Sequence, residues 1–257
     1  MNTIRRIPIF IYLLLLIFNA RVQAQTLDVT TDSLNLFDSS RNRSIPVTLY
    51  LPNANKKTAH EKLIIFSHGY NANKPGASKK YSYITENLAA WGYFVASIQH
   101  ELPTDSLLST TGIPQIVRRT NWERGVENIL FVLTELKKSN PALDYKHVIL
   151  MGHSNGGDMI MLFAQKYPEL VDKVISLDNR RVTIPRTNQP KLYSIRSSDQ
   201  PADDGVLPTQ EEQEKYKIEI VKLPNTIHND MGNNANDAQR KEINGYIMGF
   251  LKKAWGD

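Results

Sequence analysis

The chain has 257 residues, which is long enough for one α/β domain or for two small domains. With 41% hydrophobic and 22% charged residues, its composition is that of a globular protein and excludes a disordered or collagen-like chain. The absence of cysteine excludes disulfides, cysteine-ligated metal sites and cysteine nucleophiles. A formal net charge of +5 raises the question of an anionic partner such as nucleic acid, and the answer depends on where the charge lies.

Residues 1–24 have the layout of a secretory signal peptide. Arg5 and Arg6 precede an apolar run over 7–18, and the segment ends at the small residue Ala24. The run is shorter than the roughly 20 apolar residues that a transmembrane helix requires. We therefore expect cleavage after Ala24, a secreted or periplasmic product, and no stable insertion of that product into a membrane.

The predicted leader also carries much of the excess positive charge. It holds three of the 31 basic residues and none of the 26 acidic ones, so residues 25–257 have a net charge of only +2. A nucleic-acid partner is therefore not expected. Residues 25–257 contain no low-complexity linker, and we predict that they form a single domain.

Beyond the leader, strand patterns alternate with helix patterns. The extended stretches 34–37 and 45–51 flank a polar turn and predict a hairpin. Apolar runs predict buried strands at 63–66, 93–98, 148–151, 174–177 and 192–195, followed by a strand over 216–223. Apolar residues at spacings of three and four predict helices at 114–138, 154–167 and 238–255. This order predicts an α/β fold with a doubly wound, mostly parallel sheet, an N-terminal antiparallel hairpin and no large cap domain.

Three longer irregular segments follow predicted strands, at 101–113, 179–190 and 225–237. The carboxyl ends of parallel strands meet at one edge of the sheet, and open α/β sheets bind their ligands there. We therefore expect the functional residues at this edge.

Gly152, Ser154 and Gly156 form a G-x-S-x-G pattern between the strand at 148–151 and the helix predicted from 154. In such a context the serine sits on a sharp turn with Oγ above the sheet, and the glycines let neighbouring backbone approach closely. The positive end of the helix dipole lies beneath any anion that develops there. This pattern indicates that Ser154 is a nucleophile.

The segment 152–157, together with Ser67-His68-Gly69-Tyr70 after the strand at 63–66, resembles the α/β-hydrolase superfamily. Residues 88–95 are similar to a helix-to-strand passage of the same group. Within the superfamily, the motifs resemble the dienelactone-hydrolase-like and platelet-activating-factor acetylhydrolase-like serine esterases. True dienelactone hydrolases carry cysteine where this chain has Ser154, so the resemblance implies an ester substrate without identifying a lactone.

The resemblance implies a catalytic triad in the chain order serine, acid, histidine. His228 is the only one of the six histidines that follows Ser154, so it is expected to be the base. Asp199 is the preferred acid because it follows the strand at 192–195. The alternatives, which also come after predicted strands, are Asp203, Asp204 and Asp178.

The resemblance also implies an oxyanion hole made by the backbone N–H groups of Tyr70 and Asn155. His68 and His153, which stand in the same two motifs, are expected to support these turns. They do not form a metal site, because further ligands at a recognisable spacing are missing from the sequence.

The expected reaction is the hydrolysis of a small-molecule carboxylic ester through an acyl-enzyme on Ser154, without cofactor or metal. Arg180 and Arg181 follow a predicted strand and could bind an anionic group of the substrate. Two other readings remain open: a serine peptidase of the same fold, and a non-catalytic binding protein built on the hydrolase scaffold.

Overall fold

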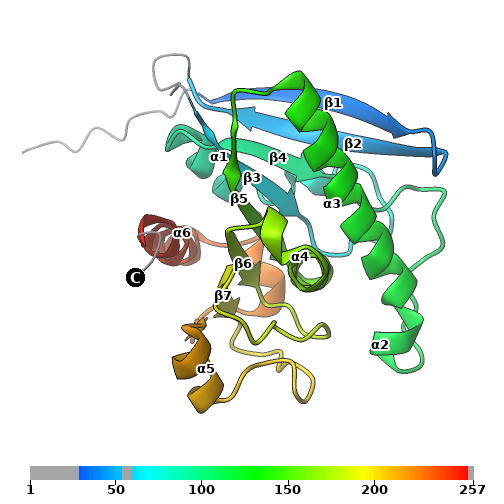
Figure 1. Ribbon diagram of the computed structural model, residues 1–257. Coiled ribbons are helices and arrows are strands. Elements are labelled where there is room, and N and C mark those ends of the chain that lie inside the picture. Colours follow the sequence, from blue (N-terminus) through cyan, green and yellow to red (C-terminus); the bar gives the residue numbers. More distant parts are fainter. Residues whose placement is uncertain (1–28, 54–59, 254–257) are drawn as a thin grey trace, which may run out of the picture.

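The computed structural model describes residues 29–53 and 60–253, so the predicted leader lies outside the described residues. At its centre is an eight-stranded sheet of order β1-β2-β4-β3-β5-β6-β7-β8 (Figure 1). The strands are β1 (Thr30–Asp38), β2 (Arg43–Leu51), β3 (Lys62–Ser67), β4 (Phe94–Ile98), β5 (Asp144–His153), β6 (Lys173–Leu177), β7 (Lys191–Arg196) and β8 (Glu219–Lys222). β2 pairs antiparallel with β1 and β4, and all other neighbours are parallel, which confirms the predicted sheet.

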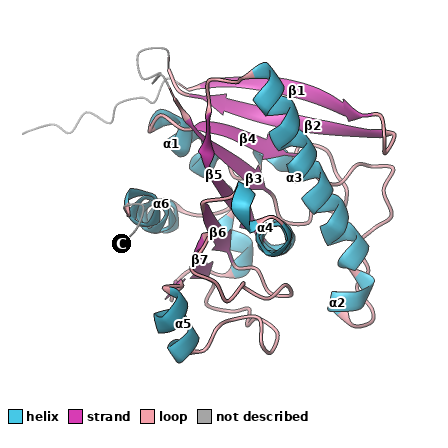
Figure 2. Ribbon diagram, viewed as in Figure 1, coloured by secondary structure: helices cyan, strands magenta, loops and turns pink. Residues whose placement is uncertain are grey.

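Helices cover both faces of this sheet (Figure 2). They are α1 (Ser82–Ala90), α2 (Pro114–Val117), α3 (Arg119–Ser139), α4 (Ser154–Lys166), α5 (Gln210–Tyr216) and α6 (Asp237–Lys252). Trp122 of α3 and Met159 of α4 belong to one hydrophobic cluster, and Leu88 of α1 and Ile243 of α6 belong to another. The sheet therefore separates two hydrophobic cores. This is expected, because parallel sheets are buried on both faces.

Side chains of the central strand β3 alternate between the two cores. Leu63 and Ile65 face the cluster with α3 and α4, whereas Ile64 and Phe66 face the cluster with α1 and α6. All four side chains are fully buried. Burial of such a side chain stabilises the fold by about 1.5–3 kcal/mol, so β3 is a rigid support for the loop that follows it.

Three elements differ from the sequence prediction. The helix expected over 114–138 is divided into α2 and α3 at Arg118, where φ is −104° and ψ is −3°. Helix α5 was not anticipated, although Thr209 and Glu212 form a capping box that marks its start. The strand expected from 216 begins only at Glu219 because α5 runs to Tyr216 and ends through the left-handed residue Lys217. None of the helices in the described ranges has the length and apolarity needed to span a bilayer.

Candidate active site

Ser154 lies on a sharp turn where β5 passes directly into α4, at the carboxyl edge of the sheet. Its φ of 51° is left-handed, a conformation that is costly for a residue with a side chain. A Cβ on Gly152 would lie 2.6 Å from the carbonyl oxygen of Gly156, and one on Gly156 would lie 2.3 Å from the carbonyl oxygen of Ser67. Only glycine fits these two positions, so the motif lets the first turn of α4 press against β3.

A continuous hydrogen-bond chain leads from this serine into the protein. Ser154 Oγ is 2.9 Å from Nε2 of His228, and Nδ1 of His228 is 2.5 Å from Oδ2 of Asp178. His228 begins the short 3-10 helix η4 (His228–Met231) after β8, and Asp178 follows β6. Asp178 is fully buried, and its φ of 58° turns the chain immediately at the strand end. The structure thus brings together a serine, a histidine and an aspartate from three separate segments.

The aspartate on the imidazole differs from the one preferred on sequence grounds. Asp199 does not contact the ring; its Oδ1 accepts a hydrogen bond from the backbone N–H of His228 at 2.8 Å. Asp203 forms an ion pair with Arg181, and Asp204 is exposed in a turn. The prediction that Asp199 contacts the imidazole ring was therefore wrong. Asp178, which directly follows β6 and is one of the three alternatives, contacts Nδ1 instead.

The surroundings of Asp178 favour its ionised form. Its carboxylate accepts hydrogen bonds from the hydroxyl and the N–H of Ser197 at 2.6 and 3.1 Å, and Nη2 of Arg196 is 2.9 Å away. Burial opposes ionisation, but the bonds from His228 and Ser197 and the charge of Arg196 outweigh it and lower the pKa of Asp178. The carboxylate can therefore hold the imidazole with Nδ1 protonated and Nε2 free to accept the proton of Ser154.

His153, the residue before Ser154, links His228 to the loop after β3. Burial lowers the pKa of His153 to about 3, and burial likewise raises the pKa of Tyr81. The Tyr81 hydroxyl donates to His153 Nδ1 at 2.6 Å, and His153 Nε2 donates to the carbonyl of His228 at 3.1 Å. The Tyr81 oxygen also accepts from the N–H of Gly69 at 3.2 Å. Tyr81 precedes a helix and belongs to no motif, so no sequence pattern marks it as a site residue.

Asn155, which follows Ser154, is fixed by its side chain in a buried polar network. Its Oδ1 accepts from Trp122 Nε1 at 2.9 Å, and its Nδ2 donates to Asn121 Oδ1 at 2.8 Å and to Glu101 Oε1 at 3.0 Å. As a residue of the first turn of α4, Asn155 has a backbone N–H without a partner inside the helix. That backbone N–H is therefore available to donate a hydrogen bond, and the side-chain contacts of Asn155 hold the residue in place.

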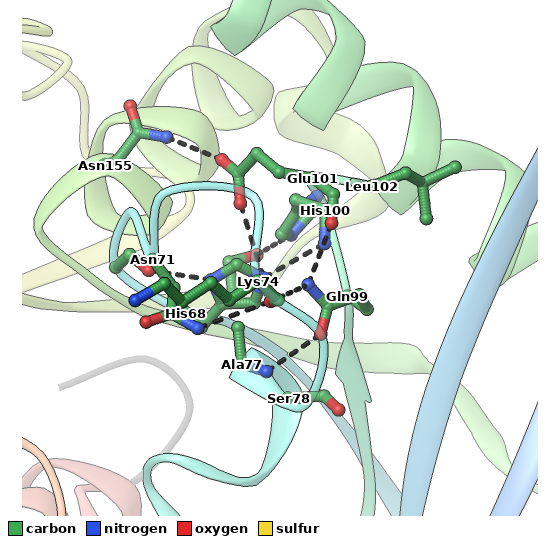
Figure 3. A network of polar contacts seen from close by, with 12 residues as sticks. His68, Asn71, Lys74, Ala77, Ser78, Gln99, His100, Glu101, Leu102 and Asn155 are labelled. Atoms are coloured by element: carbon green, nitrogen blue, oxygen red, sulfur yellow. Dashed lines mark hydrogen bonds and ion pairs between the residues drawn. The ribbon is translucent and has the colours of Figure 1, made fainter. Parts of the chain in front are cut away.

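The same network reaches the loop after β3, as Figure 3 shows for Asn155, Glu101 and His68. Glu101 Oε2 lies 3.5 Å from Nε2 of His68. His68 Nδ1 donates to the carbonyl of Gly69 at 2.8 Å, and His68 Nε2 accepts from the N–H of His100 at 3.0 Å. His68 and Glu101 therefore fix the loop that carries Tyr70 relative to the turn at Ser154.

Two cavities meet at Ser154. The larger, of about 420 Å³, is lined by His228, His153 and Tyr81 and by polar side chains that include Lys80 and Asn229. The smaller, of about 120 Å³, shares Tyr70 and Ser154 with the larger. It is lined among others by Tyr70, Asn155, Arg118, Arg180 and Arg181.

In the described parts of the chain, the acidic and histidine side chains form no cluster of three that could hold a metal ion. The two predicted arginines do lie at the site, but they differ in their contacts. Arg181 forms an ion pair with Asp203, whereas Arg180 donates to the side-chain oxygen of Gln200. Arg118, which was not predicted, lines the same cavity from the junction of α2 and α3.

Sequence comparisons relate the chain to known hydrolases. Residues 58–177, which include Ser154, match the family described as serine aminopeptidase, S33. A curated relative from Drosophila melanogaster, named "Probable serine hydrolase", is 24% identical over 124 residues, which are 48% of this chain and 38% of that protein. The chain thus spans less than half the length of this relative.

Solved structures show a similar fold over most of the chain. A bacterial heroin esterase superimposes with a TM-score of 0.61 at 13% identity, covering 88% of this chain and 85% of the other. A dienelactone hydrolase-like promiscuous phosphotriesterase from metagenomic libraries superimposes with a TM-score of 0.61 at 13% identity, covering 86% and 97%. Together with the eight-stranded sheet, the structural matches show that the chain has the α/β-hydrolase fold. In sequence, part of the chain is similar to serine hydrolases.

Proposed function

We propose that the chain hydrolyses carboxylic esters of small molecules, with Ser154 as nucleophile, His228 as base and Asp178 as the acid that orients it. The observation that carries this proposal is the unbroken chain of hydrogen bonds Ser154 Oγ, His228 and Asp178, with distances of 2.9 and 2.5 Å. Such a chain at the mouth of a cavity is the arrangement that activates a serine hydroxyl.

In the first step, His228 Nε2 takes the proton of Ser154 while Oγ attacks the ester carbonyl. The tetrahedral intermediate collapses as His228 returns this proton to the departing alcohol, which leaves the acyl group on Ser154. Water then attacks the acyl-enzyme with His228 again as base, and the acid is released with Ser154 restored. Every proton transfer in this mechanism passes through His228 Nε2.

The backbone N–H groups of Tyr70 and Asn155 are the proposed oxyanion donors. Gly69 supports this assignment because a Cβ there would lie only 3.4 Å from the Cβ of Ser154, so the loop after β3 passes close to the nucleophile. The network around Asn155 supports it further, because preorganised donors lose no energy to rearrangement during the reaction.

The decisive test is labelling with a fluorophosphonate probe, with Ser154→Ala as the matched control. We expect the wild-type chain to be labelled and to release p-nitrophenol from p-nitrophenyl acetate, and the variant to do neither at a measurable rate. Absence of both labelling and hydrolysis in the wild type would indicate a non-catalytic binding protein on this scaffold.

A serine peptidase is the second candidate, because the matching family is described as serine aminopeptidase. Peptidase and esterase share the same acyl-enzyme chemistry and differ in the leaving group. Faster cleavage of aminoacyl arylamides than of the corresponding esters would replace the esterase proposal with this one.

The place of action is also a proposal. The pattern of residues 1–24 supports export of residues 25–257 as a single-domain product, secreted or periplasmic. N-terminal sequencing of the protein recovered outside the cytoplasm is expected to begin at Gln25.

A further inference from the structure

The smaller cavity beside Ser154 is cationic. Arg118, Arg180 and Arg181 line it, and its volume is about 120 Å³. They come from two distant segments, the junction of α2 and α3 and the loop after β6. Guanidinium groups that line a narrow cavity beside a nucleophile form a recognition surface for a negatively charged group.

The acidic groups nearby do not neutralise all three arginines. Asp203 is engaged by Arg181 and by Gln115 Nε2. Asp158, which lines the cavity, directs Oδ1 to the backbone N–H groups of residues 180–182 at 3.2, 2.9 and 2.9 Å. In the described part of the chain, neither Arg118 nor Arg180 forms an ion pair with an Asp or Glu.

Arg118 and Arg180 are nevertheless held in place. Arg118 Nε donates to the carbonyl of Ser109 at 3.0 Å, and Arg180 Nη1 donates to Gln200 Oε1. Each guanidinium carries five N–H donors, so these contacts leave most donors available. The two guanidinium groups are therefore positioned without a direct carboxylate partner, although the charges of Asp158 and Asp203 act on both.

The position of the base decides which part of a substrate enters this cavity. His228 lines the larger cavity and is absent from the lining of the smaller one. Because His228 must deliver a proton to the leaving alcohol, the alcohol lies in the larger cavity. The acyl group then extends into the smaller cavity, past Tyr70 and Asn155.

We propose that the substrates are half-esters of short dicarboxylic acids, whose free carboxylate binds Arg118 and Arg180. This inference rests on the proposed esterase function and specifies its acyl group. The small volume of the cavity, about 120 Å³, suits a short acyl chain such as one of the succinyl class. A carboxylate accepts two parallel N–H bonds from a guanidinium, which a neutral chain end cannot do.

The test compares monomethyl succinate with methyl isocaproate, whose branched end has the shape of the carboxylate without its charge. Hydrolysis of both is followed in a pH-stat, and the measured quantity is the ratio of their kcat/KM values. We expect a ratio of about ten or more for the wild type, in favour of the half-ester. Arg180→Met and Arg118→Met, made separately, are each expected to lower this ratio about tenfold. The matched control is Arg119→Met, since Arg119 lies beside Arg118 in sequence but pairs with Glu123 at the surface.

The outcomes separate this inference from the proposed function. A wild type that is labelled by the fluorophosphonate and cleaves methyl isocaproate as well as monomethyl succinate overturns the inference alone. Absence of both labelling and hydrolysis overturns the esterase function and the inference with it. A preference for acetoxyacetate, which carries its carboxylate on the alcohol side, over monomethyl succinate would overturn the placement of the acyl group.

Discussion

Asp178 Oδ2 lies 2.5 Å from His228 Nδ1, and in the described residues no other carboxylate forms an ion pair with this ring. The carboxylate of Asp199 contacts the same histidine, but it accepts a hydrogen bond from the backbone N–H of His228 and does not contact the ring. One aspartate therefore orients the imidazole and the other holds the loop that carries it. This division gives the two residues different expected effects on catalysis.

Asp178→Asn is expected to lower kcat for p-nitrophenyl acetate by roughly 10³- to 10⁴-fold, because an amide stabilises neither the correct tautomer nor the imidazolium. Asp199→Asn retains an oxygen acceptor for the N–H of His228 and should lower kcat by less than about tenfold. Steady-state kinetics of both variants, with thermal unfolding as a check on folding, measure this difference. Equal losses in the two variants would return Asp199 to the role of acid.

Gly156→Ala tests the contact between the first turn of α4 and β3. The added Cβ would lie 2.3 Å from the carbonyl oxygen of Ser67 and 2.4 Å from that of His68. Both obstacles are backbone atoms, so the helix must shift, and we expect a loss of at least about 1–3 kcal/mol in the free energy of unfolding. Denaturant unfolding measures this loss, and hydrolysis should fall as the nucleophile moves.

The matched control is Gly245→Ala, in the interior of α6, where a Cβ has no neighbour within 4 Å. Alanine favours a helix over glycine by about 1 kcal/mol, so this variant should be more stable than the wild type. A Gly156→Ala variant as stable as the wild type would contradict the close packing of the serine turn.

The sequence predicts the parts of the site that depend on local pattern. Ser154 could be identified because strand, glycines and helix follow one another, and His228 because of its place in the chain order. The acid could not, because Asp178 and Asp199 both follow strands and differ only in their three-dimensional approach to the ring. Tyr81 and Arg118 also escape prediction, since tertiary packing alone brings them to Ser154.

Glu101 is expected to act as a positioning residue through Asn155. Glu101→Ala removes one of the two acceptors of Asn155 Nδ2 and leaves only Asn121 Oδ1, which lets the turn after Ser154 relax and misplaces the N–H of Asn155. We expect kcat to fall about tenfold with little change in KM, because the oxyanion contact strengthens only in the transition state. A purely structural role would lower stability and leave the kcat of the folded fraction unchanged, which active-site titration with the fluorophosphonate distinguishes.

Glu101→Gln is the conservative counterpart and should recover most of the lost kcat. Its amide oxygen can accept from Asn155 as Oε1 does now. In the described structure Glu101 Oε2 is buried without a hydrogen-bond partner, and an amide in place of this carboxylate carries no charge to desolvate. We therefore expect Glu101→Gln to be at least as stable as the wild type in denaturant unfolding. A kcat as low as that of Glu101→Ala would show that the charge of Glu101 matters rather than its position.

Asp158 predicts a pH dependence of stability with a defined sign. Burial raises its pKa to about 6, although its Oδ1 accepts three backbone N–H bonds. Between pH of about 4 and 6, the folded chain therefore keeps a proton that the unfolded chain has released. The contribution of Asp158 to the free energy of unfolding falls as pH rises through this window, by about 3 kcal/mol in total.

Asp158→Asn keeps an oxygen acceptor and cannot titrate, so it isolates this contribution. Asp172, whose pKa is also raised to about 6 by burial, contributes equally to both proteins and cancels in the comparison. Urea unfolding at several pH values from 4 to 8 is expected to show the variant gaining stability over the wild type as pH rises to about 6, with a constant difference above pH 7. A difference that does not change with pH would mean that Asp158 is ionised over the whole range, held by its three backbone donors against the cost of burial.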